Sequence, residues 1–308
     1  MKHQVRKFAT LITGALLAGS MAFFNPVLAA TGTPAPTRAQ HIKQAATAKI
    51  KQESRKKSEN FNADAVAAIK QVEQAANQLK DAKYDDAVKS LESADGKLEV
   101  AMASDPSLKL IPVAEDVNTY DLMVSPEQVK NELNAISKEL KSGNVQDARV
   151  RLDQLRSELI IRDVYLPVET YPAAIKQAVK EVSAKQYQQA QESLDAAMNS
   201  LVEEVEVMPL PVVLANDAIL DAEAKRSVDK DQAMWDLDFA HEQMLTAERL
   251  GYFYGDTDDY KTTMQHLESL RQAMGGKSEV DKLFTNAKES VKHLVDKFST
   301  RHPVQHRK

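Results

Sequence analysis

The stretch YDDAVKSLESADGKL (residues 84–98) places small and apolar residues at offsets 0, 3, 7, 10 and 14. Steps of three and four residues bring these positions to one face of an α-helix. The same offsets recur three times, with a polar first position in the last match: Val145, Ala148, Leu152, Leu155 and Leu159; Tyr187, Ala190, Leu194, Ala197 and Leu201; Lys230, Ala233, Leu237, Ala240 and Met244. The stretch is therefore predicted to be one helix of a recurring unit.

A second apolar helix precedes each of the first three matches. Its apolar residues lie 12 and 5 positions before the start of the match: Val72 and Leu79, Leu133 and Leu140, Ile175 and Val182. Short polar segments separate the two helices of each pair. Each unit is predicted to be an antiparallel helix hairpin, in which alanine allows the two axes to approach closely.

Three β-branched passages follow the first three hairpins, over residues 108–117, 159–168 and 204–213. Pro106, Pro167 and Pro209 lie 22 residues after the start of their units, where proline ends a helix. The passages are either ordered connectors or strands that pair as a small sheet. With nine glycines and one tryptophan, the chain is predicted to be mainly all-α, built from repeated helix hairpins with short extended segments.

The first 29 residues are typical of a signal peptide. Lys2, Arg6 and Lys7 precede a short apolar run, and small residues allow cleavage after Ala29, which predicts a periplasmic protein. A membrane anchor is the alternative. The absence of cysteine means that an exported chain must fold without disulfides, and a net charge of −5 gives no basis for binding nucleic acid.

The rest of the chain divides into four predicted parts. Residues 30–60 form a linker and a basic leader helix, residues 61–226 the hairpin core, residues 227–300 a helical extension, and residues 301–308 a basic tail. The basic leader suits peripheral contact with anionic lipid or an acidic partner through residues 38–58, or else is a solvated, frayed helix.

The residues expected of an enzyme are missing. HEQML (residues 241–245) places Leu245 where a zinc helix needs a second histidine. DTDDY (residues 256–260) lacks the glycine of a calcium loop and has Leu267 in place of its final glutamate. With no nucleophile motif or phosphate-binding glycine loop, the chain is predicted to be no enzyme and to use no cofactor or metal.

Two sets of residues are candidates for binding or sensing. Aromatic and sulfur side chains near the hairpin joints and extended passages suit a surface for apolar ligands or unfolded segments, although structural packing explains them as well: Tyr84, Tyr165, Tyr171, Tyr187, Met208 and Trp235. The dense group Glu203, Glu204 and Glu206 suits a response to acid, since like charges raise one another's pKa, or is a solubilising cluster.

The run from SPEQVKNELNAISKELKSGNVQDARVRLDQL to VYLPVETYPAAIKQAVKEVSAKQYQQAQESLDAAMNSLV resembles the YfdX family of exported bacterial proteins. The resemblance covers about residues 61–226 and is best over residues 120–205. It implies a periplasmic, mainly helical, self-associating protein linked to envelope stress such as acid or antimicrobials, without known catalysis. We expect a binding or chaperone-like role; a self-assembling scaffold and a binder of small apolar molecules such as drugs are alternatives.

Overall fold

The computed structural model describes residues 37–59, 61–122, 124–253, 257–275, 280–299 and 302–303. Within these ranges it has eleven helices, three long strands and one short strand. The predicted signal peptide and its cleavage site lie outside the described residues. The prediction of a mainly helical fold with a small sheet is confirmed.

The predicted hairpins are present. Four helix pairs follow one another, in the order α3 and α4, α5 and α6, α7 and α8, α9 and α10: Ala63–Lys80, Tyr84–Ser104, Pro126–Lys141, Val145–Gln154, Thr170–Ser183, Tyr187–Asn199, Leu210–Lys225 and Lys230–Arg249. Helices α11 (Asp258–Gly275) and α12 (Asp281–Phe298) complete the extension, and α2 (Thr37–Ser58) precedes the first hairpin. The leader segment is therefore helical.

The three extended passages pair as an antiparallel sheet rather than serving only as connectors. Strands β1 (Leu110–Tyr120), β2 (Glu158–Pro167) and β3 (Val202–Pro209) lie in sequence order, and β4 (His302–Pro303) adds to the edge of β3. β1 and β2 pair along their lengths with one irregularity between Pro112 and Ala114. A narrow antiparallel ribbon therefore links the hairpins.

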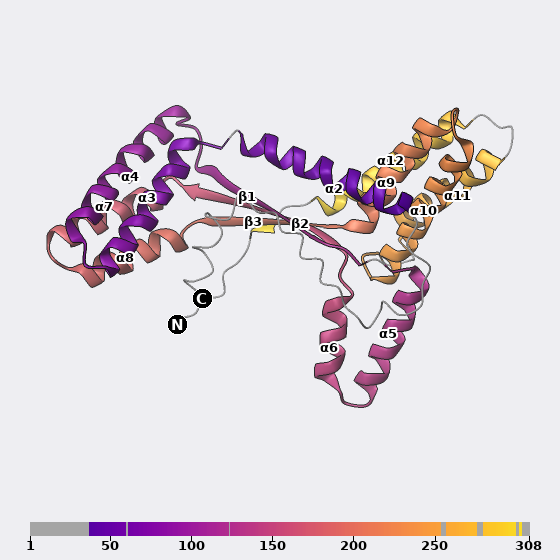
Figure 1. Ribbon diagram of the computed structural model, residues 1–308, viewed down its shortest axis with the longest axis horizontal. Coiled ribbons are helices and arrows are strands. Elements are labelled where there is room, and N and C mark those ends of the chain that lie inside the picture. Colours follow the sequence, from indigo (N-terminus) through magenta and orange to yellow (C-terminus); the bar gives the residue numbers. More distant parts are fainter. Residues whose placement is uncertain are drawn as a thin grey trace.

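The direction of the strands decides which hairpins meet. Antiparallel strands carry the chain alternately to opposite ends of the ribbon, so the first and third hairpins gather at one end and the second and fourth at the other (Figure 1). At the first end α4 contacts α7 and α3 contacts α8, forming a four-helix bundle. At the other end α9 contacts α2, α10 and α12, and α5 contacts α10.

Two predicted details are wrong. The second stripe does not remain helical to Leu159, because α6 ends at Gln154 and Leu159 lies in β2, where the β-branched run favours a strand. Pro106 also differs from Pro167 and Pro209: it precedes its strand, whereas the other two end theirs. The reason is that α4, at 21 residues, is longer than α6 or α8 and delays the start of β1.

The hairpin turns of the first three units share one backbone solution. Ala82, Gly143 and Lys185 each have φ between 57° and 80° and each lies two residues before the second helix of its unit. This left-handed conformation closes a helix C-terminus, and glycine adopts it at least cost.

Glycine at the two non-glycine turns should therefore stabilise the protein. We expect Ala82→Gly and Lys185→Gly each to raise the free energy of unfolding by about 0.5–1 kcal/mol, and Gly143→Ala to lower it by about 1 kcal/mol. Urea titration followed by circular dichroism measures these changes. The control Ala48→Gly, at an exposed position in the interior of α2, should instead destabilise the fold by about 0.5–1 kcal/mol. Equal effects at Ala82 and Ala48 would contradict the turn assignment.

Candidate apolar binding surface

The apolar faces of the four repeated helices differ in how far they are buried. In the first, third and fourth units the alanine at offset 3 and the leucine at offset 7 (Leu91, Leu194 and Leu237) are fully buried. In the second unit, Leu152 occupies the same position as those leucines and is 47% exposed. Val145, at its offset 0, is 53% exposed. The second hairpin thus leaves part of its stripe without a partner.

The first helix of the second hairpin shows the same exposure. Leu140 is 47% exposed and Leu133 is half-buried, whereas the equivalent Val72 and Leu79 of the first unit lie in the bundle core. We call Leu133, Leu140, Val145 and Leu152 the hairpin face. In the first and third hairpins, the residues at the same offsets lie where the two hairpins pack together as a bundle.

The second hairpin is well formed despite its small core. Ser125 and Gln128 make a reciprocal capping box at the start of α5. Arg151 of α6 holds α5 through Nη1 to Oε1 of Glu132 at 2.6 Å and Nε to Oε1 of Glu139 at 2.8 Å. Its buried cluster contains Ile136, Ala148 and Leu155. Ion pairs and caps therefore support a hairpin whose apolar side chains are left partly in water.

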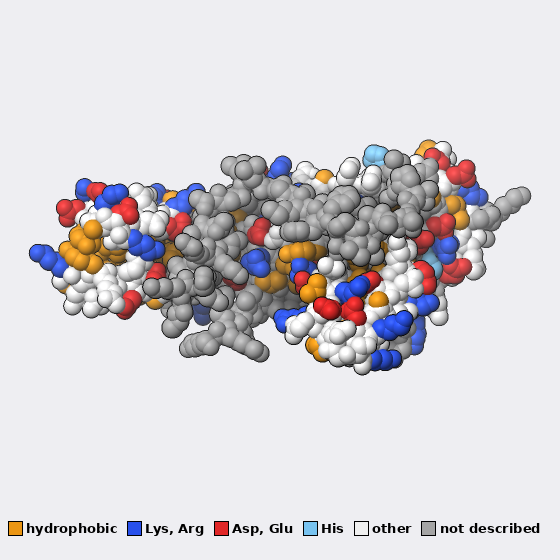
Figure 2. Space-filling view, turned by 60° about the horizontal axis from the view of Figure 1, so that its bottom comes forward, with side chains coloured by type: hydrophobic (Ala, Val, Ile, Leu, Met, Phe, Trp, Pro, Cys, Tyr) orange, Lys and Arg blue, Asp and Glu red, His pale blue; other side chains and the backbone are white. Residues whose placement is uncertain are grey.

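The hairpin projects from the rest of the molecule. In Figure 1, α5 and α6 extend away from the ribbon, and α5 meets the C-terminal bundle at α10. Figure 2, which brings that side forward, shows hydrophobic side chains among acidic and basic ones there. The hairpin face is therefore accessible to a partner.

The predicted aromatic residues do not form one groove. Tyr84 and Tyr187 stack at the tip of the first bundle, with ring centroids 3.5 Å apart. Tyr171 is fully buried and donates its hydroxyl to Sδ of Met198, so it cannot line a surface.

The remaining predicted residues are dispersed. Tyr165 and Met208 lie in β2 and β3, where Met208 Sδ accepts a hydrogen bond from Ser299 Oγ at 3.4 Å. Trp235 stacks on Phe239 in α10. Packing is what these contacts show, and a role in binding stays a prediction for each of them.

The glutamate cluster is divided by the sheet. Successive strand residues point to opposite faces, so Glu203 lies on one side and Glu204 and Glu206 on the other. Glu203 Oε2 lies 3.6 Å from Nε of Arg162. Strand alternation therefore keeps the three carboxylates from forming one cluster, and a response to acid stays a prediction.

On the other face, register creates an arrangement that the sequence did not reveal. Glu115, Asp163 and Glu204 are direct neighbours across β1, β2 and β3, and we call them the acidic row. Lys57 of α2 reaches Oε2 of Glu115 at 2.5 Å and Oδ1 of Asp163 at 2.6 Å. The basic leader helix therefore docks, in part, on the chain's own carboxylates.

Further lysines of α2 make similar contacts. Lys43 lies 2.6 Å from Asp121 and Lys49 lies 3.8 Å from Asp217, while Ala39, Ile42 and Ala46 join the C-terminal core. The helix is packed rather than solvated and frayed. Contact of residues 38–58 with a membrane stays a prediction; no described helix has a window apolar enough to span one.

A carboxyl in the first bundle has an unusual setting. Glu73 of α3 is partly buried, and in the described chain its Oε1 has neither water contact nor a hydrogen-bond partner. Burial raises the pKa of Glu73, and Lys70 opposes that rise. The pKa of Tyr171 is raised mainly by the burial of its hydroxyl and, to a smaller extent, by the negative charge of Glu73.

Glutamine at position 73 should remove a pH dependence. Because the pKa is higher in the folded chain, protonation favours folding, so stability rises as the pH falls from neutral through the raised pKa towards 4.5. We expect the free energy of unfolding of Glu73→Gln to exceed that of the wild type by about a few tenths of a kcal/mol at pH 7, since solvent screens this partly exposed group. The difference should vanish near pH 4. Thermal melts at both pH values test this. Glu92→Gln, on the exposed side of α4, should change neither.

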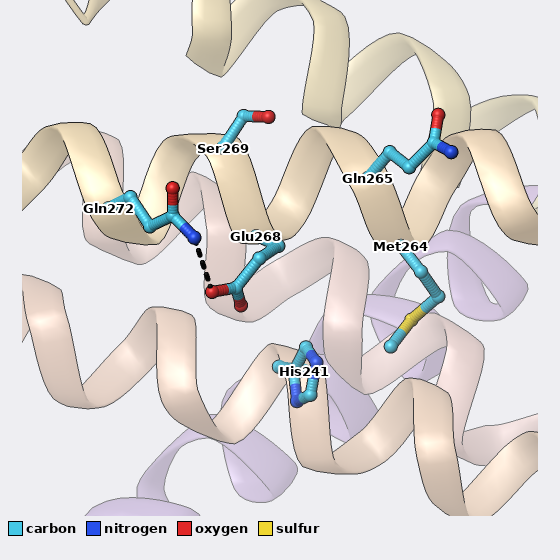
Figure 3. A pocket seen from close by; sticks show the side chains of 6 residues that line it. All are labelled: His241, Met264, Gln265, Glu268, Ser269 and Gln272. Carbon is cyan, nitrogen blue, oxygen red and sulfur yellow. Dashed lines mark hydrogen bonds between the residues drawn. The ribbon is translucent and has the colours of Figure 1, made fainter.

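An open groove of about 460 Å³ lies between α10 and α11 and is lined by His241, Met264, Gln265, Glu268, Ser269 and Gln272. In Figure 3, Gln265 and Ser269 point away from His241, while Glu268 accepts a hydrogen bond from Gln272 at 2.9 Å. Burial and the charge of Arg271 lower the pKa of His241. No group of three possible metal ligands occurs in the described part of the chain.

Comparison with known proteins gives one family. A family model described as YfdX protein matches residues 68–207, which contain β1, β2, most of β3 and the second and third hairpins. The chain is also similar to the solved structure of Salmonella Typhi YfdX, at 15% identity over 49% of this chain and 93% of that one, with a TM-score of 0.34. No curated protein matches the sequence.

Proposed function

Since the chain belongs to the YfdX family through residues 68–207, we propose that it is a non-enzymatic, periplasmic binding protein with a chaperone-like role in envelope stress such as acid or antimicrobial exposure. It holds apolar or unfolded client segments on the hairpin face. The exposure of Leu152, at a position where the other three units bury leucine, carries this proposal.

The hairpin face suits weak, reversible binding. Leu140, Val145 and Leu152 are each about half exposed, so burying the rest of each side chain contributes roughly 1 kcal/mol. Charged residues of both signs surround them on α5 and α6. Such a surface takes up apolar segments without demanding one sequence, which fits a chaperone-like role.

A second candidate is self-association through the same face, and one observation favours it. The first and third hairpins already pack their equivalent faces together as a four-helix bundle. The second hairpin is also charge-balanced, with three acidic and three basic residues on α5 and two of each on α6. A copy of the hairpin could therefore pack on it without net repulsion.

Suppression of client aggregation tests the first candidate. Residues 30–308 at equimolar ratio should suppress aggregation of thermally unfolding citrate synthase at pH 5 or pH 7. Leu152→Asp should lose at least half of this effect, while Val228→Asp, at a valine that is 84% exposed outside the hairpin, should keep it. Absence of suppression by the wild type at both pH values would reject the client-binding role.

Light scattering separates the two candidates. If the partner is a second copy, the wild type exceeds the monomer mass at micromolar concentration and Leu152→Asp is monomeric. If the partner is a client alone, both proteins are monomeric and only suppression changes. A monomeric wild type at all concentrations contradicts self-association.

A further inference from the structure

The outer edge of β3 is only partly paired. β3 pairs with β2 along all eight of its residues, whereas on its other side the described chain pairs with it at Glu204 and Val205 alone, through β4. Figure 1 shows β4 as the short yellow segment beside β3. An exposed strand edge offers backbone groups to any extended segment that can match it.

The register of β4 is supported by a separate contact. β4 runs antiparallel to β3 and pairs His302 with Val205 and Pro303 with Glu204. In this register the residue numbers of each pair add up to 507, so each step forward along β4 is one step back along β3. Ser299 and Met208 obey the same sum, and Ser299 Oγ donates to Met208 Sδ at 3.4 Å. Ser299 and β4 therefore contact β3 in the same antiparallel order. Pro303, which has no N–H, suits such an edge.

Charge complementarity favours an extension of this pairing. Residues 299–308 include Arg301, Arg307 and Lys308, two histidines and no acidic residue. Glu203, Glu204 and Glu206 lie on β3. The same register would bring residue 304 opposite Glu203 and residue 305 opposite Val202, where β3 begins. The last three residues would then meet the C-terminus of α8, whose last turn has no basic residue and attracts positive charge.

We infer that the edge of β3 is a strand-addition site for a basic extended peptide and that its occupant is this chain's own segment Val304–Lys308, continuing β4. Backbone pairing supplies the register, and the basic end supplies the attraction to the β3 glutamates and the end of α8. The tail thereby covers a sheet edge that other extended chains could otherwise join.

Hydrogen exchange of a chain ending at Ser299 tests the inference. The last described buried core residue is Leu294, so this truncation should preserve the fold, as circular dichroism verifies. Mass spectrometry should show the outward amides of residues 202–203, which the register of β4 would place opposite residues 304 and 305, exchanging at least about tenfold faster than in the full chain. Exchange within twofold of the full chain would overturn the inference.

Binding in trans gives an independent readout. The synthetic peptide TRHPVQHRK should bind the chain ending at Ser299 at least about tenfold more tightly than it binds the full chain, and should weaken as salt rises from 50 to 500 mM. A scrambled peptide is the control for simple charge attraction. Equal binding of the two peptides, or equal binding to both chains, would overturn the inference.

A full-length variant avoids truncation altogether. Arg307→Glu with Lys308→Glu should speed exchange of the β3 amides by about threefold or more. Lys89→Glu with Lys130→Glu, an equal charge change at exposed helical lysines, should not. An identical response of the two variants would show that net charge, rather than the tail, controls the edge.

Discussion

Alanine at position 194 is expected to lower the free energy of unfolding by about 3 kcal/mol, whereas alanine at position 152 lowers it by less than about 1 kcal/mol. The two leucines occupy the same place in the repeat, but Leu194 is fully buried and Leu152 is half exposed. Removing a fully buried leucine loses transfer free energy and leaves a cavity, while a half-exposed site loses less and leaves no closed void.

Urea titrations of Leu194→Ala and Leu152→Ala, with Leu91→Ala and Leu237→Ala as further buried equivalents, measure these changes. The three buried positions should agree within about 1.5 kcal/mol, since the cost depends on how far each site relaxes. A cost of 3 kcal/mol at position 152 in dilute protein would mean that the hairpin face is already buried, and would remove the basis of the proposed function.

Replacement of Lys57 by methionine should cost about 2–3 kcal/mol. Without the ammonium, Glu115 and Asp163 would remain nearly buried and adjacent but would lose their ion pairs to Lys57, and removing one partner of a buried ion pair is strongly destabilising. The expected loss of stability is smaller than for a fully buried ion pair, because about a third of the Lys57 side chain is exposed and solvent screens its charge.

Two further variants test the cause. Lys49→Met, on the same helix but with an exposed lysine 3.8 Å from its partner, should cost less than about 0.5 kcal/mol. Adding Asp163→Asn and Glu115→Gln to Lys57→Met should recover most of the loss. If the triple variant stays as unstable as Lys57→Met, packing of the α2 chain rather than charge explains the effect.

The same contact has a defined pH dependence. Burial alone would lower the pKa of Lys57, but its hydrogen bonds to Asp163 and Glu115 and their charges outweigh that effect and raise it. A raised lysine pKa contributes stability that is complete at neutral pH and is lost only as the pH rises through that pKa. We therefore expect no loss from Lys57 itself between pH 5 and pH 9.

Periodicity was enough to predict the hairpins, because an offset of three or four residues has one meaning on a helix. It could not distinguish Leu152 from Leu194, since the two stripes have the same offsets and similar residues. Their different burial depends on the strands, which carry alternate hairpins to opposite ends of the ribbon. Whether the extended passages pair was open in the sequence, and that pairing decides which hairpins find partners.

The ion pairs and the acidic row could not be predicted from the sequence either. Glu115 and Asp163 are 48 residues apart in the sequence, Asp163 and Glu204 are 41 apart, and only the strand register makes them neighbours. Lys57 is one of several basic residues in the leader, and nothing local marks it as the one that reaches the sheet. By contrast, Glu203, Glu204 and Glu206 are close in the sequence and suggested a cluster, but strand alternation divides them between two faces of the sheet.

The most direct test uses the absence of cysteine from the chain. Leu152→Cys, Leu194→Cys and Val228→Cys each introduce a single thiol, whose rate of alkylation reports its access to solvent. In dilute protein the thiol at 152 should react at a rate near that at 228 and far above that at 194. Adding an unfolding client, or concentrating the protein, should slow position 152 about tenfold and leave 228 unchanged. A thiol at 152 that is as slow as at 194 in dilute protein, or that neither client nor concentration protects, would contradict the claim that the second hairpin presents an apolar face for a partner.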